Sequence, residues 1–115
     1  MKTLEFNYTR TTDVDDDREQ EYLSIVVNYN DDYAGELLIN EETCEIRYVE
    51  IVPGYRGKGL YKMLLIAALQ EVEELISTDR NKFSNPCYIK WMGVESLSNT
   101  QSVTITLDNE KLNFE

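Results

Sequence analysis

The stretch from Val52 to Leu65, VPGYRGKGLYKMLL, constrains this chain more than any other. An apolar, strand-like run leads into a Pro-Gly turn, and an amphipathic helix follows without a conventional side-chain cap. Gly57 and Gly59 allow backbone N–H groups to turn toward one point, where the helix N-terminus adds partial positive charge. The loop also carries three cations: Arg56, Lys58 and Lys62. The sequence therefore predicts an anion-binding loop suited to a phosphate or pyrophosphate group.

The charge of the whole chain narrows its partners. The 115 residues, which we expect to form one domain over 1–115, include 11 basic and 22 acidic side chains, for a net charge of −11. Nucleic acid and anionic membranes would be repelled, so we expect neither as a partner. Cationic partners such as amines, polyamines or lysine-rich proteins are favoured. The alternatives are an acidic surface that only maintains solubility, or a mimic of DNA.

The chain contains no histidine, which excludes several classes of site. Ser-His-Asp and Cys-His catalysis and histidine-ligated zinc all need that residue. Two cysteines, Cys44 and Cys87, are too few for a four-thiolate zinc site or a dense disulfide framework, which favours a reduced, cytoplasmic protein. No apolar run approaches the ~20 residues of a membrane span, and no signal-peptide pattern is present.

One short acidic segment resembles a calcium loop, with Asp13, Asp15 and Asp17 at alternating positions. Arg18 stands where such a loop needs glycine, and Ser24 stands where it needs a bidentate glutamate. We therefore expect no metal site.

Apolar periodicity predicts an α+β fold, an antiparallel meander followed by a β-α-β crossover with a long helix packed on a mixed sheet. The expected strands are Leu4–Tyr8, Glu21–Tyr29, Tyr33–Asn40, Thr43–Val52 and Pro86–Val94. Thr11–Gln20 should be a solvated loop, and the helix should run from about Lys58 to Ile76. The right-handed crossover rule makes Pro86–Val94 parallel to Thr43–Val52.

The C-terminal tail allows two interpretations. Val103–Leu107 is alternating and β-branched, which favours a strand, whereas Ser98 or Asn99 could cap a short helix. Leu112 and Phe114 should be anchored in the fold.

The loop does not match two common nucleotide-binding motifs, but it matches a third pattern. Gly57-Lys58 is followed by Gly59 rather than Ser or Thr, and Lys62 stands where a dinucleotide fingerprint needs its third glycine. Arg56-x-x-Gly59-x-Tyr61, after Ile51-x-Pro53 at a strand end, resembles the coenzyme A motif of the GNAT superfamily of N-acetyltransferases. That motif reads Gln/Arg-x-x-Gly-x-Gly/Ala, and the resemblance is specific over about Thr43–Ile76.

The chain departs from this family in three places. Tyr61 replaces a small residue, and we expect its side chain to point away from the cofactor. The gap from Arg10 to Gln20 is too short for the two helices that usually follow the first strand, which implies an open acceptor cleft or a wall lent by a second subunit of a homodimer. Members also end with a Tyr-bearing helix and two strands. In this chain, only the segments that begin at Asn99 and at Glu110 faintly resemble that Tyr-bearing helix. Thr106 stands near the position where the family has the tyrosine.

The resemblance implies an acetyl-CoA-dependent N-acetyltransferase acting on a primary amine, such as a lysine, a protein N-terminus or a polyamine. The backbone of Val49–Ile51 would polarise the acetyl carbonyl, and N–H groups from Arg56 to Tyr61 would hold the pyrophosphate. The implied cofactor-binding residues are Val49, Glu50, Ile51, Arg56, Gly57, Lys58, Gly59, Leu60, Tyr61, Lys62 and Asn99. The alternative is a non-catalytic module of the same fold that binds acyl-CoA or a basic protein.

An acetyltransferase also needs a base, or a water relay, to neutralise the amine. Glu45, Glu50 and Glu95 are alternative candidates for one base, and each can also be a plain surface glutamate. Glu45 and Glu50 are five residues apart and project to opposite faces of a strand, so both cannot serve. We favour Glu50, which is nearest the expected thioester. Candidates for a general acid are Tyr55, Tyr61 and Tyr88, none of which matches the family position.

Overall fold

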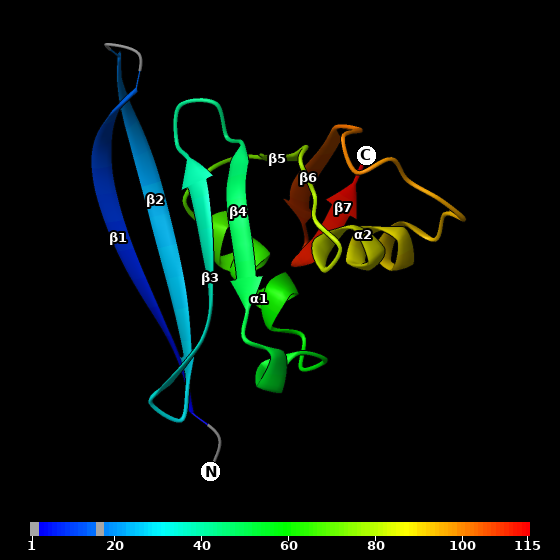
Figure 1. The fold of residues 1–115 in the computed structure, drawn as a ribbon, viewed down its shortest axis with the longest axis horizontal. Helices are drawn as coiled ribbons and strands as arrows, with labels where there is room; N and C mark the ends of the chain where they lie inside the picture. The colour runs from blue at the N-terminus through cyan, green and yellow to red at the C-terminus, as the bar shows by residue number, and fades with distance from the viewer. Residues whose placement is uncertain (1–2, 16–17) are drawn as a thin grey trace.

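The structure is a computed structural model that describes residues 3–15 and 18–115, apart from the side chains of 13–15. It contains two antiparallel sheets and two helices (Figure 1). The first sheet has the order β1 (Leu4–Asp15), β2 (Arg18–Tyr29), β3 (Asp32–Asn40) and β4 (Ile46–Ile51). The second has the order β5 (Leu75–Ser77), β6 (Val103–Asp108) and β7 (Lys111–Phe114). The 3₁₀ turn η1 (Pro53–Tyr55) and the helix α1 (Leu60–Ala68) follow β4, and the helix α2 (Ser84–Met92) follows β5. The expected α+β class and the antiparallel meander are confirmed.

The two sheets meet where β4 and β5 begin. Glu45 and Ile76 form a parallel bridge, and the Ile76 N–H donates to the Cys44 carbonyl at 2.8 Å. Among the described residues the two strands share no further ladder, so they diverge from this point. A crossover strand parallel to β4 therefore exists, but it is β5. The expectation that Pro86–Val94 would be this strand is wrong.

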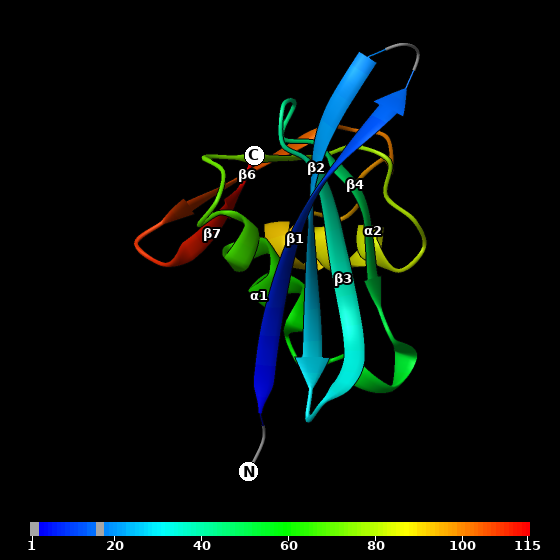
Figure 2. The ribbon, with the colours of Figure 1, turned by 90° about the vertical axis from the view of Figure 1, so that its left-hand side faces the viewer.

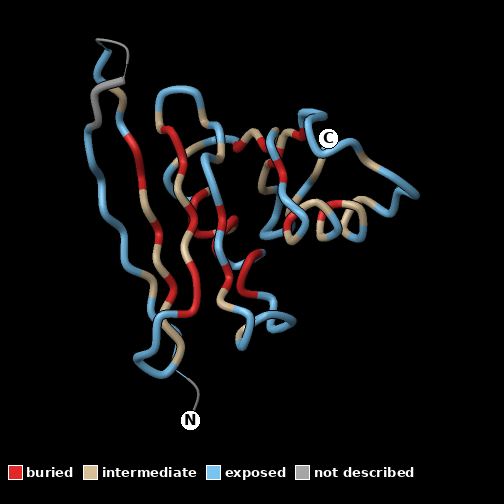
Figure 3. Tube along the Cα trace, viewed as in Figure 1, coloured by how far each residue is buried: buried red, intermediate tan, exposed pale blue. Residues whose placement is uncertain are grey.

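The core lies between the first sheet and α1 and continues to α2 and the second sheet, where Tyr88 and Ile105 are fully buried. Ile25, Leu37 and Val49 are register neighbours on adjacent strands, and all three side chains are buried. Leu64 and Leu65 of α1 are fully buried in the same cluster, and Figure 3 shows the buried residues concentrated along β2, β3 and α1. This one-sided packing fixes α1, and hence the loop before it, against the end of β4.

The acidic N-terminal segment is a β-ribbon, and the expectation of a solvated loop over Thr11–Gln20 is wrong. β1 pairs with β2 from Leu4–Tyr29 to Asp15–Arg18. β3 pairs with β2 only as far as Tyr22, so the two-stranded ribbon projects beyond the sheet (Figure 2). Its residues were expected to be solvated because they lack apolar side chains, but a ribbon exposed on both faces has the same composition. The side chains of Asp13, Asp15 and Asp17 lie outside the described residues.

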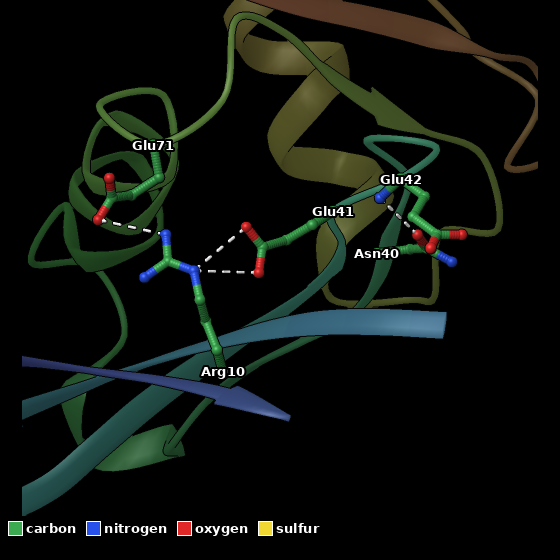
Figure 4. Close-up of polar contacts among 5 residues, drawn as sticks. All are labelled: Arg10, Asn40, Glu41, Glu42 and Glu71. Atoms are coloured by element: carbon green, nitrogen blue, oxygen red, sulfur yellow. Dashed lines mark hydrogen bonds and ion pairs between the residues drawn. The ribbon is translucent and has the colours of Figure 1, made fainter. Parts of the chain in front are cut away.

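Arg10 connects this ribbon to the rest of the fold. Its guanidinium lies 3.2 Å from Glu41 Oε1, in the β3–β4 turn, and 3.7 Å from Glu71 Oε1, beyond α1 (Figure 4). The Arg10 side chain is 54% exposed. Ion pairs this exposed contribute about 1 kcal/mol or less, so they orient the ribbon more than they stabilise the fold.

The helix after the Gly57–Gly59 loop ends eight residues earlier than expected, at Ala68 rather than Ile76. Three glutamates, Glu71, Glu73 and Glu74, follow it, and carboxylates are unfavourable near the negative end of a helix. Leu75 and Ile76, which continue the helical periodicity, instead pair with Ile105 and Thr104 of β6. Tertiary strand pairing therefore overrides the local pattern.

The segment expected as the strand Pro86–Val94 is the helix α2. Asn81 Oδ1 accepts the N–H groups of Phe83 and Ser84, and Ser84 Oγ accepts the Asn81 N–H, which is a reciprocal cap. Pro86 lies in the first turn, where its missing N–H costs no hydrogen bond. Gly93 ends the helix with φ of +67°.

The tail forms the β6–β7 hairpin. The strand expected over Val103–Leu107 is confirmed, and the alternative of a helix capped by Ser98 or Asn99 is wrong. Leu112 and Phe114 pack against the core as expected. Within the described residues, neither helix is long and apolar enough to cross a membrane.

Candidate functional site

The loop between η1 and α1 presents a group of backbone N–H donors without protein acceptors. Gly57 and Gly59 have φ of +81° and +79°, a region that favours glycine. Gly59 precedes α1 without a side-chain cap, and its carbonyl accepts the Met63 N–H at 3.2 Å. Within the described residues, the N–H groups from Gly57 to Lys62 donate to no protein acceptor. The Arg56 N–H, which was expected to be available as well, instead donates to the Pro53 carbonyl at 3.3 Å. A helix start with free donors and no acidic side chain in its first turn fits an anion.

A cavity of about 230 Å³ opens beside this loop, and we call it the outer chamber. Its lining is Ile51, Tyr55, Arg56, Gly57, Gly59, Leu60, Tyr61, Lys62, Phe83, Cys87, Lys90 and Trp91. Three of these residues are cations and none is a carboxylate, in a chain whose net charge is −11. The outer chamber is thus a local positive region on an acidic protein, which concentrates anionic ligands.

Cys87 is the nucleophilic side chain in this lining, but it is held as a thiol. Its Sγ lies 3.4 Å from the Phe83 carbonyl, to which the thiol donates. Burial raises the pKa of the Cys87 thiol, and the charges of Lys90 and Arg56 offset only part of that effect. Because the thiolate is the reactive form, the site is not arranged for cysteine nucleophilic catalysis.

The free edge of β4 forms one wall of the cleft. The Val52 N–H donates to Ala34 on β3 at 2.8 Å, and successive residues of a strand direct these groups to opposite edges. The N–H and C=O groups of Val49 and Ile51 therefore point away from β3, toward the cleft. Arg56 Nε donates to the Ile51 carbonyl at 3.0 Å, and its guanidinium lies 4.4 Å from the centroid of the Phe83 ring. Arg56 thus reaches from β4 to the start of α2 across the outer chamber.

A second cavity, the inner chamber, lies nearer the point where β4 and β5 meet and has a volume of about 60 Å³. Its lining is Ile46, Arg47, Tyr48, Val49, Tyr61, Ser77, Thr78, Asp79, Arg80, Asn81 and Ser84. Of the described residues, only Tyr61 lines both chambers. The expectation that the Tyr61 side chain would point away from the cleft is wrong. It points inward and is only 5% exposed.

Tyr61 and Tyr88 form a buried pair of hydroxyl groups. Their oxygens are 2.9 Å apart, and Tyr88 is fully buried. Burial raises the pKa of Tyr61 well above its ordinary value, and Tyr88 reinforces this. Burial also raises the pKa of Tyr88, although Ser77, Tyr61 and Arg80 counteract part of that effect. Both hydroxyls therefore stay protonated at neutral pH. Tyr61 lines both chambers, whereas Tyr88 lines neither and reaches the cleft only through its hydrogen bond with the Tyr61 hydroxyl.

Arg80 is a buried cation beneath this pair, with 4% of its surface exposed. Its guanidinium donates to the carbonyls of Ser77, Ser98 and Gln101 at 2.6 to 2.8 Å, and to Asn85 Oδ1 at 2.8 Å. Its centre lies 5.2 Å from the Tyr88 ring centroid. Arg80 therefore joins the end of β5, α2 and the loop before β6 into one rigid wall of the inner chamber.

The candidate residues from the sequence are distributed unequally around this cleft. Ile51, Arg56, Gly57, Gly59, Leu60, Tyr61 and Lys62 line the outer chamber, and Val49 lines the inner one. The Lys58 ammonium instead lies 5.6 Å from the Tyr29 ring centroid, outside both linings. Asn99 borders a separate surface hollow and accepts the Arg80 N–H through its carbonyl at 2.9 Å.

The three candidate bases Glu45, Glu50 and Glu95 are exposed and line neither chamber. Glu50 lies directly opposite Glu36 across β3 and β4, and both carboxylates raise the pKa of Tyr33, which burial and these charges bring to about 12. Asp79, two residues beyond the end of β5 and also exposed, is the carboxylate that lines the inner chamber. Sequence reasoning missed Asp79 and Arg80, since both lie in the stretch interpreted as a polar connection.

Tyr88 was considered as a general acid, but its position in the fold was misassigned. The family order implied by the loop ends with a Tyr-bearing helix and two strands, and that order is α2, β6 and β7. The tyrosine of this helix is Tyr88, so the comparison with Thr106 is wrong: Thr106 lies on β6. The capping residues Asn81 and Gly93 were the sequence signals that could have identified the helix.

Comparison with known proteins agrees with this architecture. The family model described as the acetyltransferase (GNAT) family matches residues 2–94, from the first strand to the end of α2. No curated protein and no solved structure matches significantly. The match covers most of the chain, and the loop, the splayed strands and the Tyr-bearing helix occur in the order that this family implies. The chain belongs to the GNAT acetyltransferase family.

Proposed function

We propose that this protein transfers the acetyl group of acetyl-CoA to a primary amine on a cationic acceptor. One observation carries the proposal: an uncapped, cation-lined loop opens into a cleft that runs along the free edge of β4. The free N–H groups from Gly57 to Lys62 fit a pyrophosphate, and the exposed edge of β4 fits an amide-containing arm. The residues present therefore fit coenzyme A by number and type of donors.

The proposed contacts follow the cleft inward. The N–H groups of Gly57 to Lys62 hold the pyrophosphate, with Lys62 and Lys90 supplying charge from the outer chamber. The edge groups of Val49 and Ile51 bond the arm and polarise the thioester carbonyl. Arg56 must then exchange its bond to the Ile51 carbonyl for a contact with the ligand.

Acetyl-CoA supplies a thioester whose carbonyl carbon forms a bond to the amine nitrogen while its C–S bond breaks. The amine must be neutral to attack, and Asp79 lies where a base can take its proton, directly or through water. The leaving sulfur gains a proton from the Tyr61–Tyr88 hydroxyl pair. An ammonium acceptor loses two protons in all: the first leaves through Asp79 to solvent and makes the amine neutral, and the second leaves the nitrogen as the C–N bond forms. The sulfur gains one proton, so the reaction releases one proton to solvent and balances without a metal or redox partner.

The acceptor class follows from charge. With a net charge of −11 and Asp79 in the inner chamber, a cationic acceptor such as a lysine-bearing peptide or a polyamine is favoured over an anionic one. We place this reaction in the cytoplasm and propose that a homodimer could complete the acceptor wall that the absent helices leave open.

The loop assignment is tested by calorimetry with acetyl-CoA. We expect micromolar binding to the wild type and a loss of about 100-fold or more in Gly59→Glu, because a carboxylate then faces the pyrophosphate. Gly59→Gln is the matched control, since it imposes the same backbone strain at φ of +79° without the charge. Equal affinity of the Glu and Gln variants would refute the assignment.

Turnover is tested separately by thiol release from acetyl-CoA with a panel of amines and lysine peptides. Release that depends on the amine supports the transferase. Binding without release from any amine supports the alternative, a non-catalytic acyl-CoA-binding module. That alternative is favoured by one observation, namely that Glu45, Glu50 and Glu95 all lie outside the chambers.

A further inference from the structure

The first sheet packs against a helix on one face only. Along β2, Leu23, Ile25 and Val27 are fully buried toward α1, and the residues between them are partly exposed on the opposite face. In Figure 1, α1 lies behind the sheet, and this opposite face of β2, β3 and β4, which we call the outer face, is turned toward the viewer. In the part of the chain that the structure describes, neither helix covers the outer face.

Two carboxylates lie directly opposite each other on the outer face. Glu36 of β3 is the register partner of Glu50 of β4. Glu36 accepts hydrogen bonds from Ser24 Oγ at 2.7 Å and from the Tyr33 hydroxyl at 3.5 Å. Among the described residues, no lysine or arginine forms an ion pair with either glutamate. Like charges directly opposite on neighbouring strands destabilise a sheet, so a cation from outside the chain would relieve this repulsion.

Two aromatic rings lie beside these carboxylates. Tyr33 and Tyr48 are 41% and 43% exposed, so their ring surfaces are open to a partner. Partial burial, followed by the charges of Glu50 and Glu36, raises the pKa of Tyr33 to about 12. Partial burial also raises the pKa of Tyr48, and Glu36 reinforces this through a hydrogen bond and its charge. A ring next to a carboxylate offers a cation an ion pair and the face of a π-system together.

The outer face adjoins the inner chamber at Tyr48. This residue lines that chamber together with the exposed Arg47 and Asp79, so the chamber opens to solvent along this part of β4. Arg47 lies over the Tyr22 ring, 5.8 Å from its centroid, at the end of the sheet where Tyr22 pairs with the last residue of β3. Its charge is therefore directed away from Glu50, and a chain that crosses the outer face at Glu50 can reach the mouth of the chamber past Tyr48.

We propose that the outer face binds a basic segment of the acceptor polypeptide, with an arginine or lysine at Glu36 and Glu50 while a neighbouring lysine enters the inner chamber. The inference rests on the proposed function for the transfer reaction, and it identifies the acceptor as a polypeptide with a second cation near its reactive amine. Small molecules are held in concave sites, whereas an open face with exposed rings suits a polypeptide. A second copy of this chain is disfavoured, because it brings a further net charge of −11.

The proposal is tested with a fluorescently labelled peptide of glycine and serine that contains one lysine and two arginines. The same peptide with citrulline in place of both arginines is the comparison, since citrulline keeps the size of arginine and removes its charge. Affinities are measured by fluorescence anisotropy at low salt, without acetyl-CoA. An exposed ion pair contributes up to about fivefold in affinity, so we expect the wild type to bind the arginine peptide at least tenfold more tightly.

Two double variants locate this preference on the surface. Glu36→Gln with Glu50→Gln should reduce the ratio of the two affinities to about threefold or less. Glu110→Gln with Glu115→Gln is the matched control, because it removes the same charge from exposed positions of the second sheet and should leave the ratio at tenfold or more. The first double variant should also fold, with a urea midpoint no lower than that of the wild type, since it removes a repulsion between neighbouring strands.

Each remaining outcome would overturn the proposal. Equal ratios in the two double variants would show that the preference comes from the overall charge. Loss of spermine binding but not of peptide binding in the Glu36, Glu50 variant would assign the face to a polyamine. A wild-type dimer that this variant converts to a monomer in sedimentation would assign it to a second copy. A protein that binds the arginine peptide at the outer face but fails to bind acetyl-CoA would instead refute the proposed function and leave the docking surface intact.

Discussion

At the scale of single residues, the cleft contains few groups that can move a proton. Tyr61 and Tyr88 face each other with hydroxyl oxygens 2.9 Å apart, and Tyr61 carries the pair to the chamber surface. In the proposed reaction Asp79, which lines the inner chamber, is the base. Because the chain has no histidine, we propose that the proton transfers use this aspartate and the two tyrosines.

Tyr88→Phe tests the acid half of this arrangement. The substitution keeps the ring and its packing, so acetyl-CoA affinity should stay within about twofold. The rate of transfer should fall about 100-fold, since a positioned acid contributes 10²- to 10⁴-fold. Steady-state kinetics on the best amine of the panel gives kcat and KM separately. Tyr8→Phe, on the exposed side of β1, is the control, and a Tyr88→Phe variant with the same kcat as that control would exclude the role.

At the scale of secondary-structure elements, the site depends on how α2 begins and ends. Asn81 accepts two N–H groups at the start of this helix, at 2.9 and 2.8 Å. Asn81→Ala removes both bonds and should lower the free energy of unfolding by about 1 kcal/mol. Urea denaturation measures the change, with the exposed neighbour Lys82→Ala as control. Equal midpoints for the two variants would show that the cap contributes nothing.

The same elements explain what the sequence could and could not predict. The glycine turn and the helix start that follows it were predicted correctly because this conformation is encoded locally, by Gly57 and Gly59, whereas anion binding by the loop stays a prediction. The helix α2 was mistaken for a strand because Cys87, Tyr88 and Trp91 favour strands on average. The capping residues on either side of them determine that the segment is helical. Leu75 continues the periodicity of α1 but joins β5, because its pairing partner Ile105 lies 30 residues further on and no local pattern records it.

For the candidate site, the sequence motif identified residues that line the outer chamber but not those of its opposite wall. Ile51, Arg56 and Lys62 could be assigned from one motif, and all three line the outer chamber. Asp79, Arg80 and Tyr88 come from the β5–α2 segment, whose structure was misassigned, so their proximity to β4 could not be deduced. The β5–α2 segment is placed opposite β4 by tertiary contacts. Its position can be deduced only when the parallel bridge between Glu45 and Ile76 is known.

At the scale of the whole molecule, the acidic surface and the outer chamber have opposite electrostatic effects on anionic ligands. The net charge of −11 repels anions in general, whereas the outer chamber gathers Arg56, Lys62 and Lys90 without a carboxylate. An anionic donor and a cationic acceptor can thus be attracted to different parts of one surface. High salt should weaken both attractions, because exposed charges are screened beyond about 10 Å at 0.1 M.

The buried tyrosines also make the stability of the whole fold depend on alkaline pH. Burial raises the pKa values of Tyr61 and Tyr88 above their ordinary value of 10.0, which an unfolded chain retains. The folded state therefore keeps protons that the unfolded state releases above about pH 10, so the stabilisation is complete below pH 10 and is lost as pH rises toward the folded pKa values. We expect the urea midpoint to fall between pH 9 and 11, and to fall less steeply in the Tyr61→Phe, Tyr88→Phe double variant. Tyrosinate absorbance near 295 nm gives an independent measurement, because the buried Tyr61 and Tyr88 should ionise only on unfolding, and Tyr33, with its pKa of about 12, should ionise late in both proteins. Equal pH dependence in the wild type and the double variant would show that the pair is not shielded from solvent, which would contradict the burial of Tyr61 between the two chambers.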